Sequence, residues 1–224
     1  MGDADPVRRL WTKPGTCYFG RFAKMFWGEG GRYHGMARDP GDMETNFEVR
    51  SFDSPLSSQE YRALPKHPLT IVLDNLRSAF NVGSIFRLAD TMRVHRLILC
   101  GYTAHPPHRK LEKTSLGTID FVPWQHYERT IDAVRNLKQS GIPVWAAETT
   151  SHSVRYDSIS YPSELAIVFG NEALGVDRSV LDMCDRMIEI PTYGFKNSLN
   201  VATSVSVIGY KFLEKAVEQP REGG

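Results

Sequence analysis

The sequence predicts an α/β domain with an open, mostly parallel sheet and helices on both faces. Two observations lead to this fold class. From residue 69 onward, short apolar runs rich in β-branched residues alternate with amphipathic segments of helical period. Several of these runs are apolar at consecutive positions, which is typical of strands buried on both faces of a parallel sheet.

The first half of the domain supplies two strands and one helix. LTIVLD, residues 69–74, predicts the first buried strand. NVGSIFRLADTMRV, residues 81–94, is interpreted as a loop that opens a helix with four apolar side chains on one face. RLILCG, residues 96–101, predicts the second strand, and a polar, proline-containing loop is expected at 102–118.

The second half continues the alternation, to give about five parallel strands in all. Strands are predicted at 142–149, at 165–176, where the strand runs into a glycine-bounded loop, and at 187–190. Residues 118–124 are a shorter strand candidate, and helices are predicted at 127–141 and 198–218. A further short helix is expected just before the last strand. In such sheets ligands bind beyond the carboxyl ends of the strands, so the candidate residues are sought there.

The first 50 residues differ from the rest in composition. Aromatic and basic residues interleave between residues 11 and 34, a pattern suited to single-stranded RNA. The alternative interpretation is a flexible extension, or one docked on the domain by its aromatic side chains. A short helix is predicted at 58–64 because Ser57 and Glu60 have the spacing of a capping box.

Composition limits the classes of protein. The 224 residues are 41% hydrophobic, enough for one domain (67–219) and an N-terminal extension (1–66). A formal net charge of +1 gives no global signature of nucleic-acid binding, so RNA contacts must be local. Three scattered cysteines predict neither a disulfide framework nor a zinc site, and no membrane span or signal peptide is recognised, so a cytoplasmic protein is expected.

The first strand–helix loop lacks the glycine fingerprint of dinucleotide-binding sheets. It reads NVGSIFR, which disfavours a nucleotide-dependent oxidoreductase, and the chain has no phosphate-binding P-loop. Arg87 in this segment is suited to holding a phosphate through two hydrogen bonds. The alternative is a solvated helix arginine.

Two later loops contain further candidates. In FGNEALG, Gly170 and Gly175 flank a carboxamide and a carboxylate, which favours a tight loop close to a ligand. An ordinary turn with an acid before a helix is the alternative. IPTYGFKNSLNVATSV, residues 190–205, predicts a helix that begins after an N-cap at Asn197 or Ser198, a suitable place for a polar ligand.

Taken together, three segments resemble the SpoU (TrmH-like) family of RNA ribose 2′-O-methyltransferases, in the SPOUT superfamily. They are NxGSIFR at 81–87, IVFGNExxG at 167–175 and IPxxGxxxSLNV at 190–201, in the family's order. KTSLG at 113–117 is a softer match to the substrate-side loop. The separate RNA-binding domain that some relatives carry in front is not expected in residues 1–66.

The resemblance implies a C-terminal deep trefoil knot whose loops bind S-adenosylmethionine without a metal. The implied cofactor-binding residues are Thr149, Gly170, Ile190, Ser198 and Leu199. The implied catalytic residues are Arg87, Asn81, Glu172, Ser198 and Asn200. The resemblance also implies a homodimer paired through the helices that start near Asn81 and Ser198.

The implied reaction is methyl transfer from S-adenosylmethionine to a ribose 2′-hydroxyl of RNA, with tRNA favoured over rRNA. A guanidinium stays protonated in proteins, so Arg87 is expected to bind and orient a substrate phosphate rather than to act as a simple base. The alternative is an RNA-binding protein that has this fold and no methyltransferase activity.

Overall fold

The computed structural model describes residue 54 and residues 56–218, and the chain divides into two units between Tyr61 and Arg62. The basic-aromatic segment 11–34 lies outside the described residues. The predicted capping box is confirmed: the Glu60 carboxylate accepts a hydrogen bond from Ser57 N (2.8 Å), and Ser57 Oγ accepts one from Glu60 N (3.3 Å). It opens helix α2, Ser58–Ala63, close to the predicted bounds.

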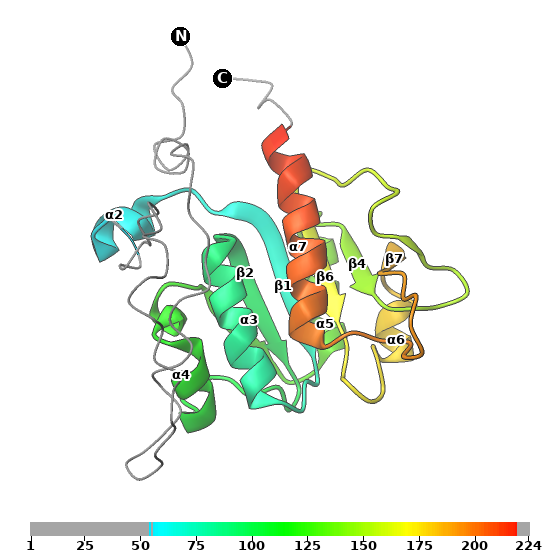
Figure 1. The fold of residues 1–224 in the computed structure, drawn as a ribbon, viewed down its shortest axis with the longest axis horizontal. Coiled ribbons are helices and arrows are strands. Elements are labelled where there is room, and N and C mark those ends of the chain that lie inside the picture. Colours follow the sequence, from blue (N-terminus) through cyan, green and yellow to red (C-terminus); the bar gives the residue numbers. More distant parts are fainter. Residues whose placement is uncertain (1–53, 55, 219–224) are drawn as a thin grey trace, which may run out of the picture. The chain divides into compact units, whose positions relative to one another are not determined.

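The second unit is built on a seven-stranded sheet, in which every strand pair is parallel within the described residues (Figure 1). Its strands are β1 (His67–Asp74), β2 (Val94–Cys100), β3 (Trp124–Tyr127), β4 (Val144–Ala147), β5 (Val154–Arg155), β6 (Leu165–Phe169) and β7 (Arg186–Glu189). Their order is β3-β2-β1-β6-β4-β7-β5. The parallel α/β sheet predicted from the sequence is therefore confirmed.

Helices cover both faces of this sheet (Figure 1). They are α3 (Ala79–Thr91), α4 (Arg109–Ser115), α5 (Thr130–Gln139), α6 (Arg178–Leu181) and α7 (Val201–Glu218). Side chains of β1 alternate between two cores: Ile71 and Leu73 belong to the cluster that includes α3 and α7, whereas Val72 belongs to the cluster that includes α5 and α6. This two-sided burial explains the continuous apolar run of the first strand.

The region between β2 and α5 corrects two predictions. The strand expected at 118–124 is displaced: Thr118–Asp120 is a 3₁₀ turn, and β3 begins at Trp124. Pro123 has no N–H to donate to the ladder, but its carbonyl accepts a hydrogen bond from Leu97 N (2.9 Å), and pairing with β2 begins there. The segment 102–118, expected to be a loop, also contains helix α4. Leu111 is the buried apolar residue of this helix, so its sequence shows no hydrophobic periodicity of helical type.

Helix α7 begins later than predicted. It starts at Val201, not at residue 198, and its cap is neither Asn197 nor Ser198. Asn200 Oδ1 accepts hydrogen bonds from Ala202 N (2.9 Å) and Thr203 N (3.4 Å), the pattern of an N-cap. The preceding residues belong to neither a helix nor a strand, and Asn197, Ser198 and Leu199 line a cavity. The two-residue strand β5 is too short to show any pattern in the sequence.

No helix in the described part of the chain is long and apolar enough to cross a membrane. The trefoil knot stays a prediction from the family resemblance.

Candidate functional site

The carboxyl ends of three adjacent strands, β6, β4 and β7, surround a cavity of about 460 Å³. The segments that follow these strands form its wall, together with the first turns of α7. Three acids, Glu148, Glu172 and Glu189, are among the described residues that line it, and no lysine or arginine is. We call it the acidic cavity.

All five residues that the resemblance assigned to the cofactor line the acidic cavity: Thr149, Gly170, Ile190, Ser198 and Leu199. They come from three segments that are far apart in the sequence and meet at one edge of the sheet. Apolar side chains of Ile188, Val201 and Ile208 complete the wall. The cavity therefore offers backbone polar groups, acids and an apolar surface to one ligand.

The loop after β6 is shaped by the carboxamide of Asn171. Its side chain is buried, and Oδ1 accepts hydrogen bonds from Ala173 N (2.8 Å) and Leu174 N (3.0 Å). Nδ2 donates to the carbonyl oxygen of Asn75 (2.7 Å) and to the hydroxyl of Tyr102 (2.6 Å). Both ends of one amide are thus satisfied, and the loop is tied to the segments that follow β1 and β2.

Gly170 is needed where this loop closes on itself. A Cβ at this position would lie 2.3 Å from Gly175 C and from Val176 N, both of which are backbone atoms. We expect Gly170→Ala to lower the free energy of unfolding by about 1–3 kcal/mol, because the loop must open to admit the methyl group. Urea denaturation measures this. Gly194→Ala is the control, since nothing lies within 4 Å of its added Cβ; equal losses in both variants would contradict the explanation.

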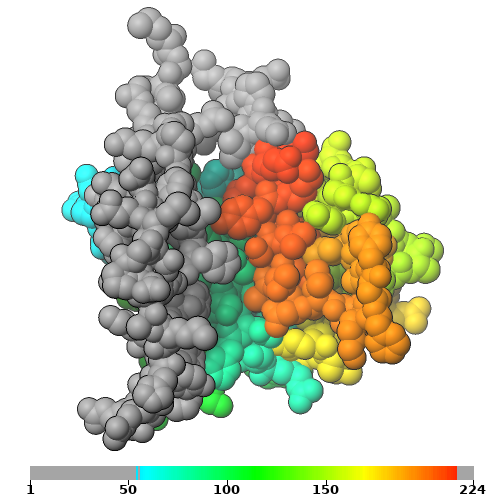
Figure 2. Space-filling model, viewed as in Figure 1, coloured from blue at the N-terminus to red at the C-terminus, as the bar shows by residue number. Residues whose placement is uncertain are grey.

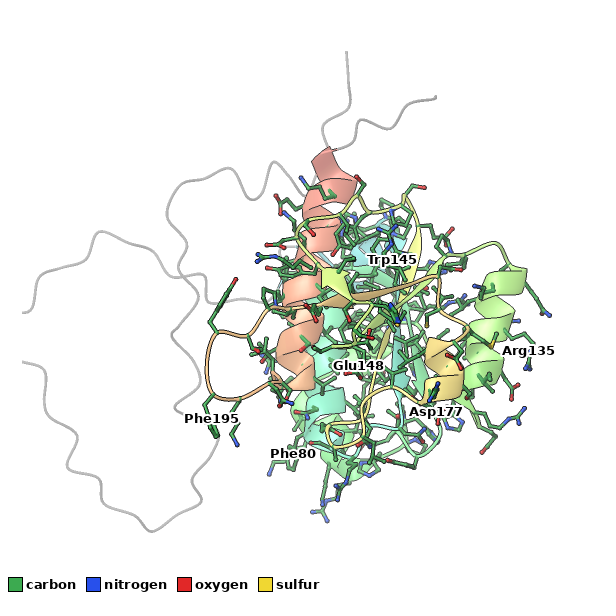
Figure 3. All side chains as sticks on the ribbon, turned by 90° about the vertical axis from the view of Figure 1, so that its right-hand side faces the viewer. Phe80, Arg135, Trp145, Glu148, Asp177 and Phe195 are labelled. Carbon is green, nitrogen blue, oxygen red and sulfur yellow. The ribbon has the colours of Figure 1, made fainter. Side chains whose placement is uncertain are left out.

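Glu148 holds the far end of the same loop. Its carboxylate accepts hydrogen bonds from Val176 N (2.8 Å) and Thr149 N (3.1 Å), and Figure 3 shows it in the middle of the domain. Its role was not predicted from the sequence. The available signal was an acid directly after the apolar run of β4.

Asp74 is a second acid whose role was not predicted from the sequence. It ends β1, its exposed fraction is 2%, and its carboxylate accepts hydrogen bonds from Asp177 N (3.0 Å), Asn75 Nδ2 (2.9 Å) and Thr130 Oγ1. These contacts connect β1 to the start of α5 and to the residue that precedes α6. A charged residue at the end of the run LTIVLD was the signal.

Three of the predicted catalytic residues form one hydrogen-bonded chain at the cavity. Asn200 Nδ2 donates to Asn81 Oδ1 (3.1 Å), and Asn81 Nδ2 donates to Glu172 Oε1 (2.9 Å). The other carboxylate oxygen of Glu172 accepts a hydrogen bond from Arg77 N (3.0 Å). Partial burial raises the pKa of the Glu172 carboxyl, but these hydrogen bonds outweigh it and hold the pKa below its ordinary value, so the group is ionised near neutral pH.

Arg87 is not brought into this chain. It lies on α3 six residues after Asn81, which is roughly 9 Å farther along the helix axis, and it is not among the residues that line the acidic cavity. The structure thus places Glu172 and Ser198 in the wall of the acidic cavity and joins Asn81 and Asn200 to Glu172 by hydrogen bonds. Arg87 belongs neither to that wall nor to this hydrogen-bonded chain.

The segment between β7 and α7 is strongly exposed. In Figure 2 its side chains, in orange, stand at the surface beside α7. The exposed fractions of Tyr193 and Phe195 are 86% and 100%, and Figure 3 shows Phe195 pointing away from the domain. Tyr193 OH accepts a hydrogen bond from Arg155 Nη1 (3.4 Å). This stretch begins and ends in the cavity wall, and its middle is exposed.

The comparisons with a family model and with known relatives indicate the same protein family. The family model described as the SpoU rRNA Methylase family matches residues 68–210. A protein of Staphylococcus epidermidis that is assigned to the TrmH family of tRNA/rRNA methyltransferases is 32% identical over 170 residues. That match covers 75% of this chain and 67% of the relative.

Two solved structures have a similar fold. The AdoMet-bound rRNA methyltransferase from Sinorhizobium meliloti has a TM-score of 0.63 and 26% identity, and the match covers 75% of this chain and 62% of that one. The TrmH/SpoU tRNA modifying enzyme of A. aeolicus has a TM-score of 0.64 and 24% identity, over 71% of this chain and 81% of that one. At that identity, the second likeness concerns the fold alone.

Proposed function

Because this chain belongs to the SpoU rRNA methylase family, we propose that it is an RNA methyltransferase that modifies a ribose 2′-hydroxyl. Its methyl donor is S-adenosylmethionine, the cofactor bound in the related rRNA methyltransferase from Sinorhizobium meliloti. tRNA is the first substrate class to test, and rRNA is the second. We assign the methyltransferase domain to residues 67–219 and place the enzyme in the cytoplasm.

The acidic cavity suits this cofactor. S-adenosylmethionine carries a sulfonium and an ammonium group, and the wall contains Glu148, Glu172 and Glu189 without a described lysine or arginine. Its volume of about 460 Å³ is in the ordinary range for small-molecule pockets. The five residues assigned to the cofactor supply backbone groups and, at Ile190 and Leu199, apolar surface.

The cofactor supplies the activated methyl group, and the protein supplies alignment. The Glu172 carboxylate orients the carboxamide of Asn81, and the Asn81 carboxamide orients the carboxamide of Asn200. Ser198, two residues before Asn200, lies in the cavity wall. We assign to these side chains the orientation of the ribose hydroxyl. Because the backbone holds Glu172 at one end of this chain and Asn200 at the other, the two carboxamides keep one orientation and need not reorganise during the reaction.

We assign to Arg87 the binding of a substrate phosphate. A guanidinium donates two parallel hydrogen bonds to a phosphate, whereas it does not release a proton near neutral pH. The chain is expected to act as a homodimer paired through α3 and α7, with each active site close to the interface. Half-exposed Tyr210 lies on α7.

Arg87→Lys tests this role by keeping the charge and removing the paired donors. We expect about a tenfold or greater loss in kcat/KM for RNA, with the affinity for S-adenosylmethionine unchanged. Steady-state methyl transfer and calorimetry provide the two measurements. Near-normal transfer by the lysine variant would exclude the two-bond role.

The observation that carries the proposal is the convergence of the cofactor segments on one acidic cavity, next to the chain from Glu172 to Asn200. Calorimetry with S-adenosylmethionine tests the cofactor site. Transfer of tritiated methyl into total tRNA and rRNA, followed by mapping of the modified ribose, tests the reaction. Absence of cofactor binding would refute the proposal, and RNA binding without transfer would favour a binding protein that has kept the fold.

A further inference from the structure

A second cavity, of about 520 Å³, lies beyond the carboxyl ends of β1 and β2, on the other side of the loop after β6. Its wall comes from residues 77–80, 101–105, 107, 108 and 110. Arg77, Lys110, His105 and His108 are among the described residues that line it, and no aspartate or glutamate is. We call it the basic cavity. Its charge is opposite to that of the acidic cavity.

Two aromatic rings in the wall of the basic cavity are available to a ligand. The exposed fractions of Phe80 and Tyr102 are 54% and 61%, although both side chains are large and hydrophobic. Each ring offers a face on which a planar base can stack. Aromatic faces beside cationic groups match the base and the phosphate of a single nucleotide.

The two cavities share a wall. Arg77, which lines the basic cavity, donates its backbone N–H to Glu172 of the acidic cavity (3.0 Å). The hydroxyl of Tyr102 accepts a hydrogen bond from Asn171, which also lines the acidic cavity (2.6 Å). A group in the basic cavity is therefore separated from the methyl-donor site by one layer of residues.

We propose that the basic cavity binds one nucleotide of the substrate RNA, with its base stacked on Phe80 and Tyr102 and its phosphate near Arg77 and Lys110. This inference rests on the proposed function and specifies where the RNA enters the site. A nucleotide in this position is unstacked from its neighbours, so the RNA is engaged in a loop or another unpaired segment. The resemblance assigned none of these four residues.

The test uses the full chain and a fluorescein-labelled oligoadenylate, with affinity followed by anisotropy. Phe80→Ala should weaken binding about tenfold, Phe80→Trp should keep it, and Phe80→Leu should behave like the alanine variant because it has volume but no ring. Calorimetry with S-adenosylmethionine should give the same affinity for all variants, and light scattering should give the same oligomeric state. Wild-type RNA affinity in Phe80→Ala would overturn the proposal.

The charge is tested by a matched pair, Lys110→Ala and Arg135→Ala. Each removes one positive charge, but Arg135 lies on α5, on the opposite side of the sheet from Phe80 (Figure 3). Lys110→Ala should reduce the slope of log affinity against log salt by about 0.7, and Arg135→Ala should leave it unchanged. Equal slopes for the two variants would also overturn the proposal.

The two proposals fail in different ways. If the wild-type chain transfers methyl groups while Phe80→Ala and Lys110→Ala bind RNA normally, the basic cavity is not the nucleotide site and the proposed function stands. If the predicted losses of affinity occur but no methyl is transferred, the nucleotide site stands and the proposed activity fails. Absence of RNA binding by the wild-type chain would overturn both.

Discussion

Replacing Glu172 by glutamine is expected to slow methyl transfer about a hundredfold, with a smaller effect on the affinity for S-adenosylmethionine. The carboxylate accepts hydrogen bonds at both oxygens, from Asn81 Nδ2 (2.9 Å) and from Arg77 N (3.0 Å). A glutamine amide has one acceptor oxygen, so one of these donors must face an NH₂ group. Asn81 then loses its fixed orientation, and Asn200 loses its partner.

Single-turnover transfer into total tRNA and rRNA measures this loss. Glu164→Gln is the matched control, because Glu164 is exposed and lies outside the residues that line the acidic cavity. Equal rates for Glu172→Gln and the wild type would remove Glu172 from the site. A hundredfold loss that is accompanied by an equal loss of cofactor affinity would make it a cofactor residue instead.

The pH dependence of stability gives a readout of Glu172 that does not need activity. Its pKa is held below the ordinary value in the folded state, so the ionised group stabilises the fold above the unfolded-state pKa of about 4.3. This contribution is lost as the pH falls through the lower folded-state value. The stability difference between the wild type and Glu172→Gln should therefore be constant near neutral pH and shrink below about pH 4.

Asp74→Ala is expected to lower the free energy of unfolding by about 4 kcal/mol. The carboxylate is buried and accepts hydrogen bonds from Asp177 N, Asn75 Nδ2 and Thr130 Oγ1, so its removal leaves one buried hydroxyl and two partly buried donors without an acceptor. Because Asp177 follows the loop that forms the cavity wall, the same change should weaken cofactor binding. Figure 3 shows Asp177 where that loop meets α6.

Urea denaturation and calorimetry measure these two effects. Asp132→Ala is the control: Asp132 pairs with Arg129 and Arg135 on the exposed surface of α5, where an ion pair contributes about 0–1 kcal/mol. A loss below about 1 kcal/mol for Asp74→Ala would mean that water replaces the missing acceptor.

The fold class was predictable because its signal is local. A strand buried on both faces must be apolar at consecutive positions, and LTIVLD and LAIVF carry that pattern in five or six adjacent residues. The capping box at Ser57 and Glu60 is equally local, since both partners lie within one helical turn. Helix α4 and strand β5 were missed because a single apolar contact or two residues cannot establish a period.

The loop segments could be predicted as candidate site segments, but the contacts between them could not. Their glycines, amides and acids could be recognised in the sequence, and the resemblance placed them in one family. That Asn81 contacts Glu172, and Asn200 contacts Asn81, depends on separations of 91 and 119 residues along the chain, which no local pattern encodes. The same holds for Asp74 and Glu148, whose partners are supplied by distant loops.

The sequence by itself therefore determined the parallel α/β architecture, the family and the segments that line the acidic cavity. Only the tertiary structure decided that Asn200 is the cap of α7, that Arg87 lies apart from the acidic cavity, and that a basic cavity with two exposed rings adjoins it. The physical reason is that hydrophobic periodicity is set by neighbouring residues, whereas hydrogen-bond partners and cavity walls are set by segments that meet only after the sheet has formed.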